Sequence, residues 1–535
     1  MEKQIIPTKQ EMSINGVRDL LKFMKANILF LVIITFSCFL VYANLIKGKF
    51  INLDDMAGFV QNPNIGNISA TIKGFDGYST YKALVFKLFG MSSTAYHVSA
   101  IVLHVINSIL VFLLIYVIFG KKIAIIVTFM FITHPTNVEG VGWLSGFPYI
   151  LRSPIILSVL LFFSIYKKSN NIKCFFISSL IFFFGVLYFR GSGWIFITPF
   201  LVVLTDQFIF EKKIEWKNIK IYLPFILVSA IFAGMVIPSL FSQRVKELQT
   251  LYYVNLETST PLVNRIPYTI YMAYRLLVFP LELSIYHEGK VLSSAMYTFM
   301  VVVAIAIIFA IFYLWKKDRV ISGLMMMILF SILPSFSPII IAWTAAERYL
   351  YLGSVFSSTI IALLITKVEN KYKIKNFTII AAATIITLYS IRSVFRTNDF
   401  KDSKHLWFAT RKTAPYSYRV YNNLGDVYAD EKNYELALEN FKRSLALKPD
   451  YADAVHNIGF IYYEMGDIER SKKYLTQALN MNPNLYQSSF KLGEIYYREG
   501  NYSLARDYFL KCLEANPENQ DCKSYLNSIV PVTGQ

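Results

Sequence analysis

Long apolar runs, separated by short polar segments, recur from residue 27 to about residue 395. A helix needs about 20 mostly apolar residues to cross a bilayer, within a range of about 17–25. Most of these runs reach that length, so we predict an all-α, polytopic membrane bundle of about eleven spans. The spans are expected at residues 27–46, 97–119, 123–138, 149–166, 172–189, 193–210, 221–240, 296–315, 320–342, 349–366 and 376–395.

Two apolar runs depart from this pattern. The 123–138 run is short and carries His134-Pro135 near its outer end. Residues 266–281 are also short, contain Arg275 and end near a proline. Counting them as a span would place the basic residues 316–319 outside the cytoplasm, so we interpret them as an interfacial or re-entrant helix.

Clusters of lysine and arginine between the runs determine the predicted orientation, because cytoplasmic loops are enriched in these residues. The clusters lie in the N-terminal tail and at residues 121–122, 167–173, 212–220, 316–319 and 367–375. Together they place the N-terminus in the cytoplasm and the end of the chain outside it. The predicted parts are a tail at 1–26, a membrane domain at 27–396 with external loops 47–95 and 241–295, a linker at 397–414, and an external domain at 415–535.

A 34-residue repeat marks the C-terminal domain. Glycines recur at Gly425, Gly459 and Gly493, and leucine, tyrosine, small and proline positions keep the same spacing. This is the tetratricopeptide (TPR) pattern, in which a small residue lets two antiparallel helices approach closely and a proline follows the second helix. We predict three TPR repeats and a capping helix in an α-solenoid whose groove binds a protein or peptide.

The composition agrees with a membrane protein. Hydrophobic residues make up 55% of the chain and charged residues only 16%, which is below the level of soluble domains. The formal net charge is +18, but much of the excess lies in the short loop clusters, which face anionic lipid rather than nucleic acid. The richness in isoleucine, lysine and asparagine favours a bacterial inner or cell membrane.

The four cysteines form no CxxC pair, and no metal site is indicated, although a divalent metal is not excluded. A Cys512–Cys522 disulfide is possible if their domain lies outside the cytoplasm. His97 and His104, seven residues apart, have no ligand partners at suitable spacing, so we expect buried polar packing rather than metal binding.

Three polar segments at the predicted external boundary have residues suited to chemistry. The pair Asp54-Asp55 follows the first span, where a carboxylate could act as general base toward a hydroxyl; the alternative is an acidic turn or helix cap. His134 and Glu139 lie at the outer end of the third span, where ionisable residues usually face protein or water; the alternative is interface anchoring by Trp143. Glu347 lies in the third segment, just before the tenth span.

Four arginines at or near the external face could hold a phosphate through charge-assisted hydrogen bonds. They are Arg152, Arg190, Arg275 and Arg348. The alternative for each is snorkelling to the lipid headgroups. No nucleotide-binding loop is present, so an external transfer reaction needs an activated donor, which a lipid-linked sugar phosphate would supply.

Four of these segments, in chain order, carry a family resemblance. They are Asn52-Leu53-Asp54-Asp55 with Asn62-Pro63, Ala95-Tyr96-His97 through His104 and Asn107, His134-Pro135 with Val138-Glu139 and Trp143-Leu144-Ser145-Gly146, and Glu347-Arg348-Tyr349-Leu350-Tyr351. With the TPR repeats they resemble the transmembrane-and-TPR-containing O-mannosyltransferases and their bacterial relatives, within the GT-C superfamily of polyprenyl-phosphate-sugar-dependent glycosyltransferases.

The resemblance implies a GT-C fold and Asp54 or Asp55 as catalytic base or site organiser. It also implies a polyprenyl-phosphate-linked hexose donor, inversion at the anomeric carbon and an outward-facing TPR domain. The chain departs from the family pattern in two places. Phe147-Pro148-Tyr149 stands where an arginine and a second charged residue usually follow, and Glu347 stands where aspartate is usual.

The leading hypothesis is therefore a membrane glycosyltransferase that moves a mannose-like hexose from a polyprenyl phosphate to an extracytoplasmic, protein hydroxyl. In it, Arg348 stabilises the leaving phosphate. One alternative is a non-catalytic membrane scaffold whose TPR groove recruits envelope proteins. Another is a lipid-linked glycan polymerase or transporter; matching broken spans in two halves, typical of transporters, are not seen.

Overall fold

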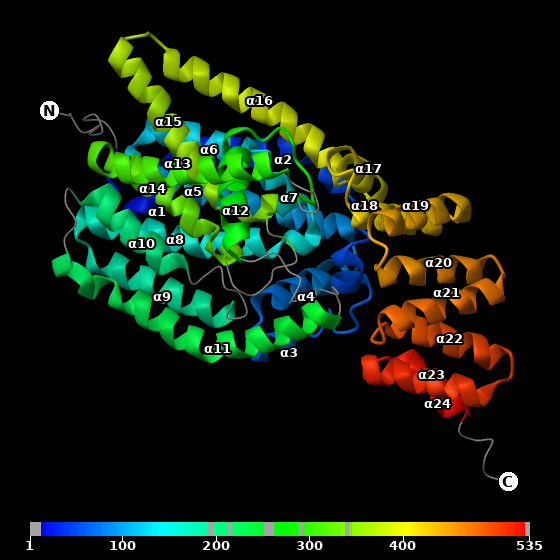
Figure 1. Cartoon of the computed structure of the whole chain (residues 1–535). Coiled ribbons are helices and arrows are strands. Elements are labelled where there is room, and N and C mark those ends of the chain that lie inside the picture. Colours follow the sequence, from blue (N-terminus) through cyan, green and yellow to red (C-terminus); the bar gives the residue numbers. More distant parts are fainter. Residues whose placement is uncertain are drawn as a thin grey trace. The chain divides into compact units, whose positions relative to one another are not determined.

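The computed structural model describes residues 12–189, 197–211, 216–250, 262–287, 293–336, 343 and 345–529. Within these ranges the regular structure is entirely helical, as predicted (Figure 1). The chain forms two compact units, Met1–His405 and Leu406–Gln535. Helix α17 (Ser403–Thr413) begins in the first unit and continues into the second. The 397–414 segment, predicted as a linker, is thus largely helical.

The first unit contains sixteen α-helices in its described ranges. They are α1 (Val17–Ala26), α2 (Ile28–Val41), α3 (Ile68–Lys73), α4 (Gly77–Phe89), α5 (Ser93–Phe119), α6 (Lys121–Thr133), α7 (Asn137–Gly142), α8 (Pro148–Ser169), α9 (Ile172–Tyr188), α10 (Thr198–Leu204), α11 (Leu223–Thr250), α12 (Leu262–Val278), α13 (Ser294–Lys317), α14 (Arg319–Ser331), α15 (Gly353–Tyr372) and α16 (Phe377–Asp399).

Several of these helices are long and apolar enough to cross a membrane, which indicates a membrane protein. Four stretches in the described residues qualify: Ser93–Phe119, Leu144–Ser169, Ser294–Lys317 and Phe377–Asp399. The α1–α2 pair, bent by 73°, would be a fifth. The predicted number of eleven is not reached by these criteria, because other apolar runs form shorter helices. For example, α6 ends at Thr133, where His134 adopts the extended backbone that a following proline favours.

Helix α5 is central to the first unit and packs against α2, α6 and α8. Its buried polar side chains are satisfied from other helices. The His104 Nδ1 lies 2.6 Å from the Tyr351 hydroxyl, and Asn107 donates to the Ile150 carbonyl oxygen at 2.9 Å. The expectation that His104 packs as a buried polar residue is therefore confirmed. These bonds also hold the segment after the fourth motif against α5 and α8.

The second unit is built from sequential helix pairs, which Figure 1 shows in yellow to red. After α17, the helices are α18 (Tyr418–Asp430), α19 (Tyr434–Leu447), α20 (Ala452–Glu464), α21 (Ile468–Met481), α22 (Tyr486–Arg498), α23 (Tyr502–Ala515) and α24 (Gln520–Ile529). Each packs mainly against the next one in sequence, as expected of a TPR solenoid.

The repeat glycines mark the closest approach within each helix pair. A Cβ atom on Gly493 would lie 2.7 Å from the Phe509 ring, and one on Gly459 would lie 2.9 Å from Leu475. Gly425 approaches Phe441 in the same way. Only glycine fits at such a distance, which is why the spacing of 34 residues reports the fold directly.

The last pair is closed by a covalent bond. Cys512 of α23 and Cys522 of α24 form a disulfide, so the pairing considered from the sequence is present in the structure. Both residues are buried beside Phe509 and Tyr525. Helix α24 is thereby held as the cap of the solenoid.

Candidate functional site

The Asp54-Asp55 segment is anchored by Asp55. The Asp55 Oδ1 accepts hydrogen bonds from the Ser145 backbone N–H at 2.8 Å and from the Ser145 hydroxyl at 2.6 Å. Its Oδ2 accepts from the Ile51 N–H at 3.1 Å. Asp55 is 0% exposed, whereas Asp54 is half-buried. The two neighbouring carboxylates therefore have different environments, and Asp55 binds the first motif to the third.

Burial raises the pKa of Asp55 from 3.8 to about 6, and the nearby Asp54 carboxylate raises it further, although the three hydrogen bonds oppose the shift. Tyr78, near the start of α4, lies within electrostatic range of both aspartates and of Arg152. Burial, followed by the Asp55 and Asp54 carboxylates, raises the pKa of the Tyr78 hydroxyl. An acid pair, a phenol and an arginine therefore share one region of the first unit.

The third and fourth motifs meet in a buried ion pair. The Arg348 guanidinium contacts the Glu139 carboxylate, and the Arg348 backbone N–H donates to Glu139 Oε2 at 3.2 Å. Glu139 is 0% and Arg348 is 3% exposed. The guanidinium carbon lies 4.7 Å from the centre of the Trp143 ring and 4.6 Å from that of Trp343. The charge of Arg348 is thus compensated by Glu139 and enclosed by aromatic rings.

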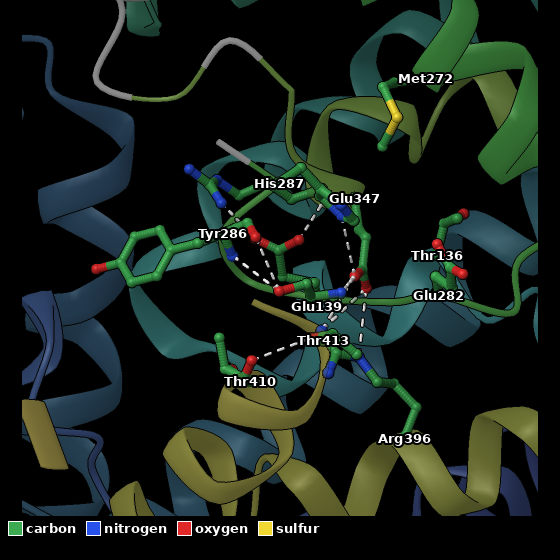
Figure 2. A network of polar contacts seen from close by, with 12 residues as sticks. Thr136, Glu139, Met272, Glu282, Tyr286, His287, Glu347, Arg396, Thr410 and Thr413 are labelled. Atoms are coloured by element: carbon green, nitrogen blue, oxygen red, sulfur yellow. Dashed lines mark hydrogen bonds and ion pairs between the residues drawn. The ribbon is translucent and has the colours of Figure 1, made fainter. Parts of the chain in front are cut away.

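Glu347, the residue before Arg348, points to different partners. Its carboxylate accepts from Arg396 of α16 at 3.1 Å and from the Ser284 N–H at 2.5 Å, as Figure 2 shows in part. The His287 Nε2 lies 3.5 Å from the same carboxylate. Because two consecutive residues of the 3-10 helix η8 (Glu347–Leu350) engage opposite partners, this short helix joins α7 to α16.

His134 has a separate role in the structure. It is buried, with Nε2 3.2 Å from the Leu277 carbonyl oxygen of α12 and Nδ1 2.8 Å from the Thr136 hydroxyl. In the described part of the chain, no hydrogen bond or ion pair links it to Glu139 or Glu347. His134 instead connects the end of α6 to α12.

The four predicted phosphate-binding arginines differ in their surroundings. Arg152 and Arg348 line the same small pocket, together with Tyr149, Ser153, Ile156, Ile197, Tyr349, Tyr351 and Leu352. Arg275 is remote from that pocket lining and pairs with Glu282, whose side chain is 74% exposed. Arg190 lies outside the described residues.

Arg152 differs from Arg348 in lacking a compensating acid. Among the described residues, no carboxylate lies within ion-pair distance of Arg152, and its buried Nε–H has no acceptor. The indole N–H groups of Trp143 and Trp343 are also buried without an acceptor there. An uncompensated cation and free donors are costly to bury, so this region is suited to an anionic ligand. The described residues contain no group of three metal-ligating side chains.

Sequence reasoning missed three residues of this site. Ser145 was quoted only as part of a motif, although its hydroxyl holds Asp55. Arg396 lies near the end of an apolar helix, and its pairing with Glu347 is formed across 49 residues. Tyr78 lies in the first external loop and has no local signal. Only the arginine was detectable in principle, as a charge inside an apolar run.

Comparisons with known proteins support the repeat assignment and part of the resemblance. Family models described as TPR repeat and tetratricopeptide repeat match residues 425–466 and 458–519, which confirms the predicted repeats. The chain is 26% identical to the Protein O-mannosyl-transferase TMTC3 of Mus musculus over 110 residues, 21% of this chain and 12% of that protein. It is 22% identical to the Protein O-mannosyl-transferase F38B6.6 of Caenorhabditis elegans over 454 residues, 77% of this chain and 61% of that protein.

The matched stretches thus span less than two thirds of the length of these relatives. Among solved structures, MamA aligns with a TM-score of 0.20 and 17% identity, over 32% of this chain and 94% of that one. This score is too low to inform the fold. The comparisons therefore establish TPR repeats and a distant similarity to proteins named as O-mannosyl-transferases.

Proposed function

We propose that this chain is a membrane glycosyltransferase of the GT-C type, with about eleven spans and an outward-facing TPR unit. It would transfer a mannose-like hexose from a polyprenyl phosphate to a hydroxyl group of an extracytoplasmic protein. The observation that carries the proposal is the joining of the Asp54-Asp55 segment to Ser145, in one region with the uncompensated Arg152. The distant similarity over 77% of the chain points to the same activity.

The two aspartates take different parts in this proposal. Asp55 is enclosed and accepts three hydrogen bonds, so it organises the segment. Asp54 is half-buried, which leaves an edge for an acceptor, so we assign it as general base. The acceptor oxygen attacks the anomeric carbon as its proton moves to Asp54. The bond from that carbon to the phosphate oxygen breaks, and the configuration inverts.

The leaving phosphate needs a cation, and Arg152 meets this need better than Arg348. The Arg348 charge is already balanced by Glu139, whereas Arg152 has no acid within ion-pair distance in the described residues. Arg348 lines the same pocket and would shape it. Preorganised donors facing a developing negative charge are a major source of rate acceleration in enzymes.

An apolar cavity near Arg152 is suited to the isoprenoid chain. It measures about 480 Å³ and is lined by Ile155 of α8 and by residues 177–189 of α9 and its end. Ile155 follows Arg152 by three residues, so the two share one face of α8. A chain lying in this cavity would bring its phosphate toward Arg152.

The TPR unit would present the acceptor protein, as TPR grooves bind peptides. The Cys512–Cys522 disulfide favours an extracytoplasmic position, where such bonds persist. The predicted orientation from the basic loops agrees with this. A bacterial inner or cell membrane remains our proposal for its location.

The test is mass spectrometry of glycans on extracytoplasmic proteins from cells with wild type, Asp54→Asn or Asp55→Asn at matched expression. We expect one glycan to be lost from defined proteins in both variants. Glu282→Gln, at an exposed residue outside the site, is the control and should retain the glycan. Unchanged glycans in the folded, inserted aspartate variants would reject the transferase and favour the TPR scaffold.

A further inference from the structure

The segment from Arg396 to Ser403, here called the junction segment, contacts three of the four family-like motifs. Arg396 pairs with Glu347 of the fourth motif. The fully buried Phe400 packs on Gly142, between Glu139 and Ser145 of the third motif, where an added Cβ would lie 3.1 Å from Phe400. Its last residues bind the segment that leads to Asp54. A stretch predicted in part as a linker is therefore an element of the site's framework.

Two hydrogen bonds join the junction segment to the residues before Asp54. The Lys49 N–H donates to the Lys401 carbonyl oxygen at 2.8 Å. The Asn52 N–H donates to the Ser403 hydroxyl oxygen, also at 2.8 Å. On the other side, the Ser93 hydroxyl donates to the Gly48 carbonyl oxygen at 2.6 Å. Residues 48–52 are thus held between α5 and the junction segment.

The Ser403 bond is the one placed to act on Asp54. Ile51 and Asp55 are fully buried and have their own contacts, so they stay in place when Ser403 changes. Between them, Asn52, Leu53 and Asp54 are only half-buried. The bond to Asn52 therefore restrains the part of the segment that has least packing, two residues before the proposed base.

We propose that Ser403 is a positioning residue for transfer, holding the half-buried Asn52–Asp54 stretch so that the Asp54 carboxylate faces the acceptor. This inference rests on the proposed function. Small misplacements of a reacting group reduce the rate strongly while leaving the fold intact, about 100-fold for a shift of about 1 Å. Donor binding is assigned to Arg152 of α8, a separate element, so losing the Ser403 bond should lower kcat and leave the donor KM unchanged.

The experiment compares wild type, Ser403→Ala and Ser403→Thr in the purified full chain, with a polyprenyl-phosphate-linked mannose and an acceptor protein found by the glycan analysis. We expect at least about a tenfold fall in kcat for Ser403→Ala at unchanged donor KM. Ser403→Thr keeps the hydroxyl and should restore kcat. The matched control is Ser390→Ala, because the Ser390 hydroxyl donates only within α16, to the Ile386 carbonyl at 2.7 Å.

A second measurement, hydrogen–deuterium exchange, follows the segment without reference to activity. In Ser403→Ala, exchange should rise in peptides covering residues 48–55 and stay unchanged elsewhere in the first unit. Unchanged kcat, or an equal loss in Ser390→Ala, or no rescue by threonine, would overturn the inference while the transferase stands. A wild type without transfer would reject the proposed function and the positioning role together, even where the exchange result shows that the Asn52–Ser403 bond exists.

Discussion

The Asp55 carboxylate receives both the backbone N–H and the hydroxyl of Ser145, a residue 90 positions later in the chain. This contact joins the first external loop to the segment that precedes α8. It also separates the roles of two adjacent aspartates, since one carboxylate is saturated with hydrogen bonds and the other is half-exposed. The following predictions test the contacts around this arrangement.

Transfer is expected to fall as the pH drops below about 6, the raised pKa of Asp55. A proton on Asp55 would occupy an oxygen that now accepts an N–H or O–H group, which loosens its attachment to Ser145. Ser145→Ala removes a bond that favours the ionised carboxylate, so the acid limb of the pH–rate profile should move to higher pH. Ser145→Thr should keep the original midpoint.

The stability of the fold serves as the control for this pH effect. Because the folded-state pKa of Asp55 is raised, its contribution to stability is largest below the usual value of 3.8 and is lost as the pH rises through about 6. Asp54 and Tyr78, which face Asp55, stay within the same enclosed region. Lost transfer at pH 5 with no contribution from Asp55 to unfolding supports the prediction, and an unshifted limb in Ser145→Ala contradicts it.

Arg152→Ala is expected to raise the KM for the lipid-linked donor by about tenfold or more, since a hydrogen bond to a charged group contributes about 1.5–3 kcal/mol. Arg275→Ala is the matched control, because Arg275 pairs with the exposed Glu282 rather than lining the pocket. Steady-state kinetics with varied donor measure both. Equal KM values for Arg152→Ala and wild type would remove Arg152 from the donor site.

Glu139→Gln is expected to destabilise the first unit by about 3–5 kcal/mol, because it leaves the Arg348 charge buried without its partner. Trp143 and Trp343 enclose this guanidinium, so tryptophan fluorescence during chemical unfolding reports on the site. The double variant Glu139→Gln/Arg348→Met should recover most of the loss. Losses that simply add in the double variant would show that the two residues do not act as a pair.

Lys432→Gly is expected to stabilise the first TPR repeat by up to about 1 kcal/mol. Lys432 has a left-handed backbone with φ 59°, at the position where the next repeats have Gly466 at 81° and Gly500 at 77°. Glycine adopts this conformation without steric cost. Hydrogen exchange in α18 and α19 measures the change, with Gly466→Lys as the reversed control in the second repeat. Faster exchange in Lys432→Gly would contradict the argument.

The helical class, the repeat boundaries and the motif positions were open to prediction because each depends on local periodicity. The 34-residue spacing places Gly459 against Leu475 in any chain that folds as a TPR. The span count was less predictable. Apolar composition extends past the point where a helix ends, as at His134-Pro135, so the length of a run overestimates the length of its helix.

The sequence by itself determined that the chain is helical, that apolar runs fill its first part and that TPR repeats fill its last. These properties arise from side-chain period, apolar content and spacing, which are written along the chain. Only the tertiary structure decided the partners: Asp55 with Ser145, Glu139 with Arg348, and Asn52 with Ser403. Such pairings form across 90, 209 and 351 residues, where burial and hydrogen-bond geometry, rather than local pattern, select the contact.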